Sequence, residues 1–125
     1  LALIALRGFE AGDEEAFLTL YRACLDHYGV ARPGPAGEGR ILDLLARERH
    51  MSALLAWDGD TPLGFATWAL TFPAGPGIAL YLKELFVASS ARGRGLGRAL
   101  LAGLIDIAEA EADRMLFNRQ IGLNP

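Results

Sequence analysis

Three glycines and three arginines are concentrated in one short segment of this sequence, and their spacing suits the binding of a phosphate. The positions concerned are Arg92, Gly93, Arg94, Gly95, Gly97 and Arg98. An apolar run precedes the segment and a run with helical periodicity follows it, so it is predicted to join a strand to a helix. Backbone N–H groups at the start of a helix stabilise anions, and glycines let a phosphate approach closely. The arginines add positive charge at the same place.

Two better-known phosphate loops differ from this segment in spacing. A P-loop requires Gly-Lys-Ser/Thr, and the segment contains no lysine. A dinucleotide-binding fingerprint reads G-x-G-x-x-G, whereas the three glycines here follow one another at intervals of two. The pattern that fits is Arg/Gln-x-x-Gly-x-Gly/Ala, through Arg92, Gly95 and Gly97. A tight structural turn is the alternative, although three arginines exceed what a turn requires.

One carboxylate interrupts the apolar strand that is predicted to lead into this loop. The strand covers Ala79–Ala88, with Glu84 near its middle. Strand alternation gives one face with Leu82, Glu84 and Phe86 and another with Lys83, Leu85 and Val87. A carboxylate among apolar residues is costly unless it is partnered or functional. Glu84 is therefore a candidate general base or amine-binding acid, and a rim carboxylate paired with an arginine is the structural alternative.

Other residues with chemical potential are weaker candidates. Tyr28 and Trp68 are predicted to bind a cationic substrate through their rings, although ordinary packing is the simpler explanation for each. His27 and His50 lack the spacing of metal ligands, so no metal site is predicted. Cys24 falls on the apolar side of a predicted helix, where core filling is the expected role rather than nucleophilic catalysis.

The elements that must position these residues follow from periodicity and turn signals. Strands are predicted over residues 3–7, 52–57, 63–72 and 79–88, with a further strand beginning at 115–117. A first helix follows the N-cap Asp13 and ends at Gly29, a second covers 41–46, and a long third runs from the glycine loop to about 112. The stretches 31–39 and 73–77, rich in proline and glycine, are predicted as a loop and a turn. The order β-α-α-β-β-β-α-(β) implies an α+β or mixed α/β fold.

The composition excludes several classes of protein. The chain has 125 residues, of which 52% are hydrophobic and 22% charged, with a net charge of -3. A soluble globular domain is expected, with no nucleic-acid partner and no membrane span. Cys24 is the only cysteine, so no disulfide forms within the chain, and a cytoplasmic location is expected.

The loop, the hairpin before it and the order of elements together resemble the GNAT superfamily of acetyl-coenzyme A-dependent N-acetyltransferases. The resemblance covers roughly residues 2–112. It implies a central, mostly antiparallel twisted sheet flanked by helices, in a single domain over residues 1–125 that is incomplete at its C-terminus. It further implies acetyl-coenzyme A as co-substrate and a homodimer.

The resemblance also implies roles for individual residues. Backbone groups of Leu85, Phe86 and Val87 would hold the pantetheine arm and the thioester. The loop would hold the pyrophosphate through Arg92, Gly93, Arg94, Gly95, Leu96, Gly97 and Arg98. The family's usual general acid is a tyrosine after the last long helix, and no tyrosine follows Tyr81 in this sequence.

Within the superfamily, the sequence is most similar to the diamine (spermidine/spermine) N-acetyltransferase branch. The similarity rests on residues 64–68, 71–72 and 80–87. Members of the branch carry two acids after Tyr-Leu. Here Lys83 replaces the first acid and Glu84 keeps the second, and Lys83 would repel a polycation if it faced the site.

The predicted function is the transfer of an acetyl group to a primary amine, on a small molecule or a peptide, by direct attack on the thioester. Glu84 would remove the amine proton or bind the amine. A non-catalytic acyl-coenzyme A-binding or regulatory domain is the alternative, favoured by the missing tyrosine. A third possibility is an interaction module with a structural glycine loop, which the arginines around that loop disfavour.

Overall fold

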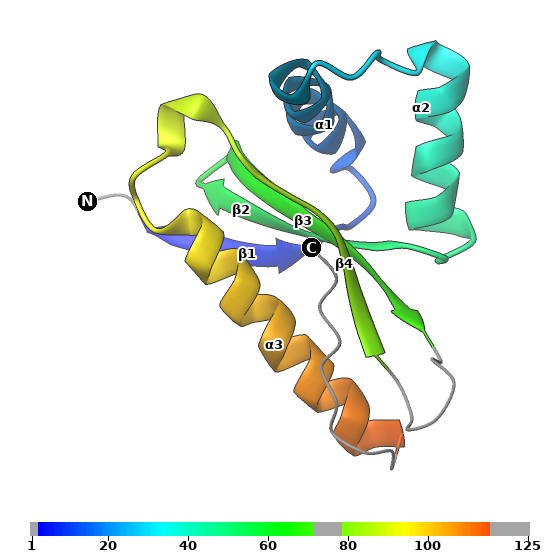
Figure 1. The fold of residues 1–125 in the computed structure, drawn as a ribbon, viewed down its shortest axis with the longest axis vertical. Helices are drawn as coiled ribbons and strands as arrows, with labels where there is room; N and C mark the ends of the chain where they lie inside the picture. The colour runs from blue at the N-terminus through cyan, green and yellow to red at the C-terminus, as the bar shows by residue number, and fades with distance from the viewer. Residues whose placement is uncertain (1–2, 72–78, 116–125) are drawn as a thin grey trace.

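The computed structural model of the chain describes residues 3–71 and 79–115, in which four strands form one antiparallel sheet (Figure 1). The strands, in sheet order, are β1 (Ile4–Gly8), β2 (Ser52–Asp58), β3 (Thr61–Thr71) and β4 (Ala79–Val87). The helices are α1 (Glu14–Tyr28), α2 (Gly34–Leu42) and α3 (Leu96–Met115), with a π-helical turn η1 (Asp43–Arg47) and a 3-10 turn η2 (Ser89–Ala91). The predicted mixed α/β class and the antiparallel sheet are confirmed.

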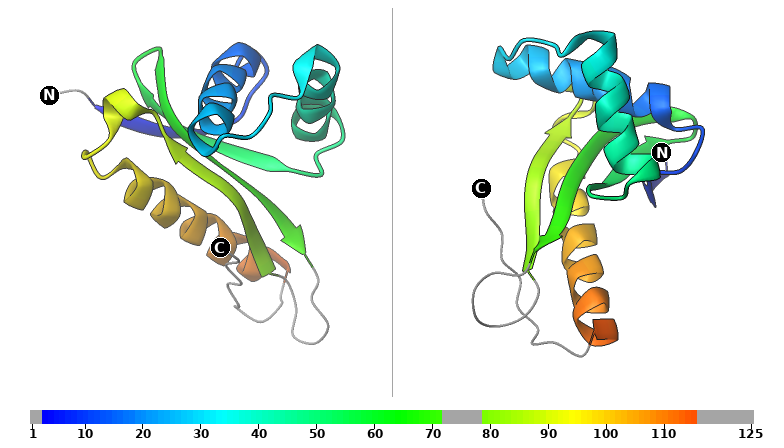
Figure 2. Two further views of the ribbon diagram at one scale, coloured as in Figure 1. Left: turned by 45° about the horizontal axis from the view of Figure 1, so that its top comes forward. Right: turned by 90° about the vertical axis from the view of Figure 1, so that its right-hand side faces the viewer.

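The sheet separates two hydrophobic layers. Figures 1 and 2 show α3 on one face and α1 with α2 on the other. The face under α3 buries Leu54, Trp68, Leu80, Leu100 and Leu104. The face under α1 buries Phe17, Leu20, Leu55, Phe65 and Phe86. Helical spacing in the sequence predicts the apolar stripe of α3, and the packing of that helix confirms it.

The predicted ends of α1 agree with the structure. The helix starts at Glu14, and the backbone oxygen of Asp13 accepts a hydrogen bond from Phe17 N at 2.9 Å. The Asp13 carboxylate accepts from Glu10 N at 3.0 Å and so does not cap the helix. Gly29 ends the helix at φ 70°, a left-handed conformation that favours glycine.

The prediction of a loop over residues 31–39 is wrong, because α2 begins inside that stretch. Pro35 occupies the first turn, where a helix needs no N–H from it and the ring favours helical backbone. Arg22 of α1 donates two hydrogen bonds, each 2.8 Å long, to the Glu38 carboxylate, so α2 is tied to α1. Tertiary contacts thus outweigh the low helix propensity of the glycines. The helix predicted over 41–46 is the end of α2 together with η1.

A β-bulge overturns part of the predicted face assignment in β4. Thr67 pairs with Glu84, whereas the next residue, Trp68, pairs with Leu82, so Lys83 is an extra residue in β4. One inserted residue reverses the alternation of side chains. Leu82 therefore packs against the α3 cluster instead of sharing a face with Glu84 and Phe86.

Two further predictions concern the C-terminal half of the chain. The turn at 73–77 lies outside the described residues. The strand predicted to begin at 115–117 also lies outside them except for Met115, which is the last residue of α3.

Candidate active site

The glycine loop connects the end of β4 to the start of α3. Gly93 and Gly95 have φ values of 82° and 75°, which side-chain-bearing residues rarely adopt. A Cβ at either position would meet no atom within 4 Å, so the constraint is the backbone conformation and not crowding. The Gly95 carbonyl accepts the first helical bond, from Ala99 N at 3.1 Å. The first N–H groups of α3 therefore have no partner within the helix and suit an anion.

The arginines of the loop differ in their contacts. All three side chains are exposed, and neither Arg94 nor Arg98 pairs with any residue that the structure describes. Arg92 instead donates from Nε to the Val87 carbonyl at 3.1 Å, and its guanidinium lies 5.5 Å from the centre of the Phe86 ring. Arg94 and Arg98 are thus available for a phosphate, whereas Arg92 is bound to the end of β4.

In the described part of the chain, β4 pairs only with β3, so its other edge is open. Ala88 N donates to Leu63 O at 2.8 Å, so Ala88 and Leu63 form a hydrogen-bonded pair of the ladder between β4 and β3. Because such pairs alternate along an antiparallel ladder, Phe86 bonds with Phe65, while Leu85 and Val87 direct their backbone groups outward. Two of the three predicted pantetheine contacts therefore lie on the open edge.

Glu84 lies on the α1 face, and its partner is Thr67 of β3. The Thr67 hydroxyl donates to Glu84 Oε1 and accepts from Glu84 N at 3.2 Å. Thr67 is 0% exposed, and an unpaired buried hydroxyl would cost about 1–3 kcal/mol, so these bonds explain how it is accommodated. Glu84 forms no ion pair with a described residue. The alternative role for Glu84, a rim carboxylate paired with an arginine, therefore has no arginine partner among the described residues.

Two side chains of α1 lie near this carboxylate. Burial, and then the negative charge of Glu84, raise the pKa of the Tyr21 phenol. The same two causes, in the same order, raise the pKa of the Cys24 thiol. A thiol with a raised pKa is a poor nucleophile at neutral pH, so Cys24 fits the predicted core-filling role. Tyr21 stacks on Phe17, with ring centres 5.7 Å apart.

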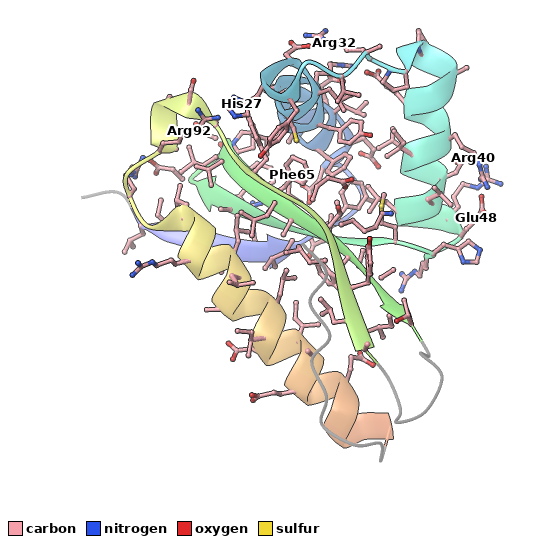
Figure 3. The ribbon with its side chains drawn as sticks, viewed as in Figure 1. His27, Arg32, Arg40, Glu48, Phe65 and Arg92 are labelled. Atoms are coloured by element: carbon pink, nitrogen blue, oxygen red, sulfur yellow. The ribbon has the colours of Figure 1, made fainter. Side chains whose placement is uncertain are left out.

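The C-terminal end of α1 meets the end of β4. The His27 ring lies 5.9 Å from the Phe86 ring and 4.8 Å from the Tyr28 ring, both measured between centres. Figure 3 shows His27 and Arg92 on neighbouring elements in this region. Tyr28 is 65% exposed.

Trp68 lies away from the other predicted substrate-binding residues. Its ring packs with the cluster beneath α3, on the face opposite Glu84. It also lines a hollow of about 630 Å³ with Phe9, Leu45, Met51 and Ile107 among its other walls. No residue of β4 or of the glycine loop contributes to that hollow, so it is separate from the candidate site.

Sequence reasoning missed two residues that the fold brings to Glu84. Thr67 has a weak signal, a hydroxyl in an apolar strand, but its partner depends on the register between β3 and β4. Tyr21 has no signal of its own, because its position depends on how α1 crosses the sheet.

Two negative findings apply to residues 3–71 and 79–115. No group of three side chains there has the arrangement of a metal site. None of the helices is long and apolar enough to cross a membrane.

The comparison with protein families identifies this architecture. Residues 15–121 match the family described as Acetyltransferase (GNAT) family. The match spans most of the chain, so the chain belongs to this family, and the superfamily resemblance is confirmed. The protein is an N-acetyltransferase that uses acetyl-coenzyme A as co-substrate. No curated protein has a similar sequence.

Solved structures share the fold at low sequence identity. One is a ribosomal-protein-alanine N-acetyltransferase from Brucella melitensis biovar Abortus 2308, with TM-score 0.74 and 21% identity, over 98% of this chain and 80% of that chain. Another is a predicted acetyltransferase with acetyl-CoA from Clostridium acetobutylicum, with TM-score 0.74 and 16% identity, over 98% and 81%. A third is an aminoglycoside acetyltransferase from an uncultured soil metagenomic sample in complex with sisomicin, with TM-score 0.76 and 13% identity, over 98% and 77%.

Proposed function

We propose that the protein transfers the acetyl group of acetyl-coenzyme A to a primary amine of a small molecule. The observation that carries this proposal is Glu84, a half-buried carboxylate without a basic partner among the described residues, on the strand that leads into the glycine loop. Such a carboxylate attracts an ammonium group, and it can also accept the proton that the amine must lose.

The site would be organised along the open edge of β4. Arg94, Arg98 and the first N–H groups of α3 would hold the pyrophosphate. The pantetheine arm would follow the outward N–H of Val87, whose carbonyl accepts from Arg92, and the outward backbone groups of Leu85 toward Glu84. Glu84 lies three residues from Val87, which is about 10 Å along a strand. The thioester would thus reach the carboxylate.

The proposed reaction is a direct transfer. The amine nitrogen attacks the acetyl carbonyl carbon, so a C–N bond forms as the C–S bond breaks. The amine proton passes to Glu84, directly or through one water, and the sulfur leaves as a thiolate that takes up a proton.

The acceptor class follows from the charges near Glu84. One carboxylate near Tyr21 and Cys24, on the face that also buries Phe86, suits one ammonium group next to apolar surface. The sequence similarity to the diamine branch makes diamines the first acceptors to try. Aminoglycosides come next, because one similar structure is an aminoglycoside acetyltransferase in complex with sisomicin. We also propose that the protein is cytoplasmic and that it forms a homodimer. Light scattering would check the homodimer by its mass.

The test compares Glu84→Gln with the wild-type protein. The amide keeps the shape but neither accepts a proton readily nor carries charge, so turnover should fall roughly 100-fold or more. The affinity for acetyl-coenzyme A should stay the same, because the loop is unchanged. Glu109→Gln removes an exposed carboxylate of α3 and serves as the matched control.

Each outcome of this comparison has a distinct meaning. Unchanged turnover in Glu84→Gln would remove Glu84 from the mechanism. Binding of acetyl-coenzyme A without turnover on any amine by the wild-type protein would favour the non-catalytic binding domain.

A further inference from the structure

Thr67 is the polar residue that is fully buried in the part of the chain that the structure describes. We propose that Thr67 is a positioning residue for Glu84: its hydroxyl holds one carboxylate oxygen so that the other oxygen faces the acceptor amine. The inference rests on the proposed function of Glu84, and it adds a second residue to that function.

The geometry divides the two oxygens of the carboxylate between two tasks. The single hydroxyl hydrogen of Thr67 is donated to Glu84 Oε1. Glu84 Oε2 accepts no hydrogen bond from a described residue. The Thr67 hydroxyl also accepts a hydrogen bond from Glu84 N at 3.2 Å, so it contacts both the side chain and the backbone of Glu84. The Glu84 side chain therefore has a fixed attachment and an unpaired oxygen.

The β-bulge explains why such an attachment matters. Lys83 is the extra residue in β4, and it directly precedes Glu84. A bulge disrupts the ladder locally and redirects the side chains next to it. Strand pairing alone therefore fixes the Glu84 side chain less firmly than in a regular strand. The Thr67 hydroxyl supplies the missing constraint from the neighbouring strand.

A neutral partner also preserves the charge of Glu84 for the substrate. An arginine in the place of Thr67 would neutralise the carboxylate and compete with an ammonium group. Thr67 instead donates one hydrogen bond and adds no charge. The nearby groups on α1, Tyr21 and Cys24, are mostly uncharged at neutral pH even at their ordinary pKa values, and burial and then Glu84 raise both pKa values further.

The test uses two substitutions that separate the hydroxyl of Thr67 from its methyl group. Thr67→Val keeps the shape but loses the hydroxyl, whereas Thr67→Ser keeps the hydroxyl but loses the methyl group. Misplacement of a catalytic group costs roughly 10- to 100-fold, so kcat of Thr67→Val should fall by about that factor. The KM for acetyl-coenzyme A should not change. Thr67→Ser should keep most of the wild-type kcat.

The double variant with Glu84→Gln separates positioning from a merely structural role. If Thr67 acts through Glu84, Thr67→Val should cause no further loss of kcat in the Glu84→Gln background. Losses that multiply in the double variant would overturn the proposal. So would equal kcat in Thr67→Val and wild type, or equal impairment in Thr67→Ser and Thr67→Val.

A measurement that needs no turnover distinguishes this proposal from the proposed function. The carboxyl ¹³C resonance of Glu84, assigned with the Glu84→Gln variant, reports the hydrogen bond from Thr67. It should move in Thr67→Val and stay close to its wild-type position in Thr67→Ser. If the resonance moves but Glu84→Gln has full turnover, the attachment exists and the proposed role of Glu84 fails. If it does not move in Thr67→Val, the positioning role is overturned.

Discussion

The charged side chains of the candidate site differ in their partners. Glu84 has a neutral partner, the Thr67 hydroxyl, whereas Arg92 donates to a backbone carbonyl and lies against Phe86. Arg94 and Arg98 are exposed and have no described partner. At the scale of single residues, a charged side chain without an oppositely charged partner among the described residues is the feature that indicates a role in binding a ligand.

Cys24 gives a prediction at the residue scale that depends on pH. Burial and the charge of Glu84 raise its pKa, so at pH 7–8 the folded protein holds less thiolate than an unfolded chain. Iodoacetamide should therefore modify Cys24 at least about 10-fold more slowly in the native protein than in urea, where the ordinary pKa of about 8.5 applies. Mass spectrometry of timed samples measures both rates. Equal rates would contradict the buried position of Cys24.

A matching substitution tests whether the thiol takes part in the reaction. Cys24→Ala removes the sulfur, and turnover should stay within about twofold of the wild type if Cys24 only fills the core. A loss of several hundred-fold, with acetyl-coenzyme A binding intact, would assign it a catalytic role instead.

At the scale of elements, the ion pair between Arg22 and Glu38 joins α1 to α2. Arg22 lowers the pKa of Glu38 in the folded protein, chiefly through the hydrogen bond between them. The unfolded chain keeps the ordinary glutamate pKa of about 4.3. As the pH falls below that value, the unfolded chain takes up a proton first. The stability that Glu38 contributes is therefore present above about pH 4.3 and is lost as the pH falls through the folded pKa.

The corresponding variant is Glu38→Gln. It should be less stable than the wild type at pH 7, and the difference should shrink between pH 5 and pH 3. Urea denaturation followed by circular dichroism at several pH values measures this. A difference that grows on acidification would contradict the predicted sign.

The contact between β3 and β4 at Gly64 gives a second prediction for the elements. A Cβ at Gly64 would lie 2.8 Å from the Phe86 carbonyl oxygen, which is backbone and cannot turn aside. Gly64→Ala should lower the free energy of unfolding by about 1–3 kcal/mol, through overpacking. In Gly39→Ala, the control, the added Cβ meets no atom within 4 Å, and α2 should gain up to about 1 kcal/mol. Thermal unfolding of both variants decides whether Gly64 is required for close packing.

Some of these elements are predictable from the sequence alone, and others are not. Local residue spacing predicts the four described strands, α1, the glycine loop and the apolar stripe of α3. The structure contains each of them. The start of α2 is not predicted from the sequence, because its contacts are non-local: Glu38 pairs with Arg22, which lies 16 positions earlier in the chain. The predicted face of Leu82 is wrong, because the bulge that redirects its side chain depends on the pairing of β3 with β4. Thr67 could not be paired with Glu84 for the same reason.

At the scale of the whole molecule, the fold gives the two sides of the sheet different tasks. Each side buries an apolar cluster, and the side beneath α3 holds no candidate catalytic residue in the described part of the chain. The other side carries Glu84 and Thr67 next to α1. Near the glycine loop, His27 and Arg92 come from neighbouring elements (Figure 3), and both lie within 6 Å of the centre of the Phe86 ring, at 5.9 Å and 5.5 Å.

The most direct test of the account is calorimetric titration with acetyl-coenzyme A of the wild-type protein and of Arg94→Ala/Arg98→Ala. Both arginines are exposed and unpartnered among the described residues, so the variant should stay folded while it loses charge-assisted bonds to phosphate. We expect binding by the wild type and at least about 10-fold weaker binding by the variant, or roughly 1.4 kcal/mol. Arg47→Ala, which removes an exposed arginine of η1, should bind like the wild type. Equal affinity in all three proteins, or no binding by folded wild type, would contradict a cofactor site at the glycine loop.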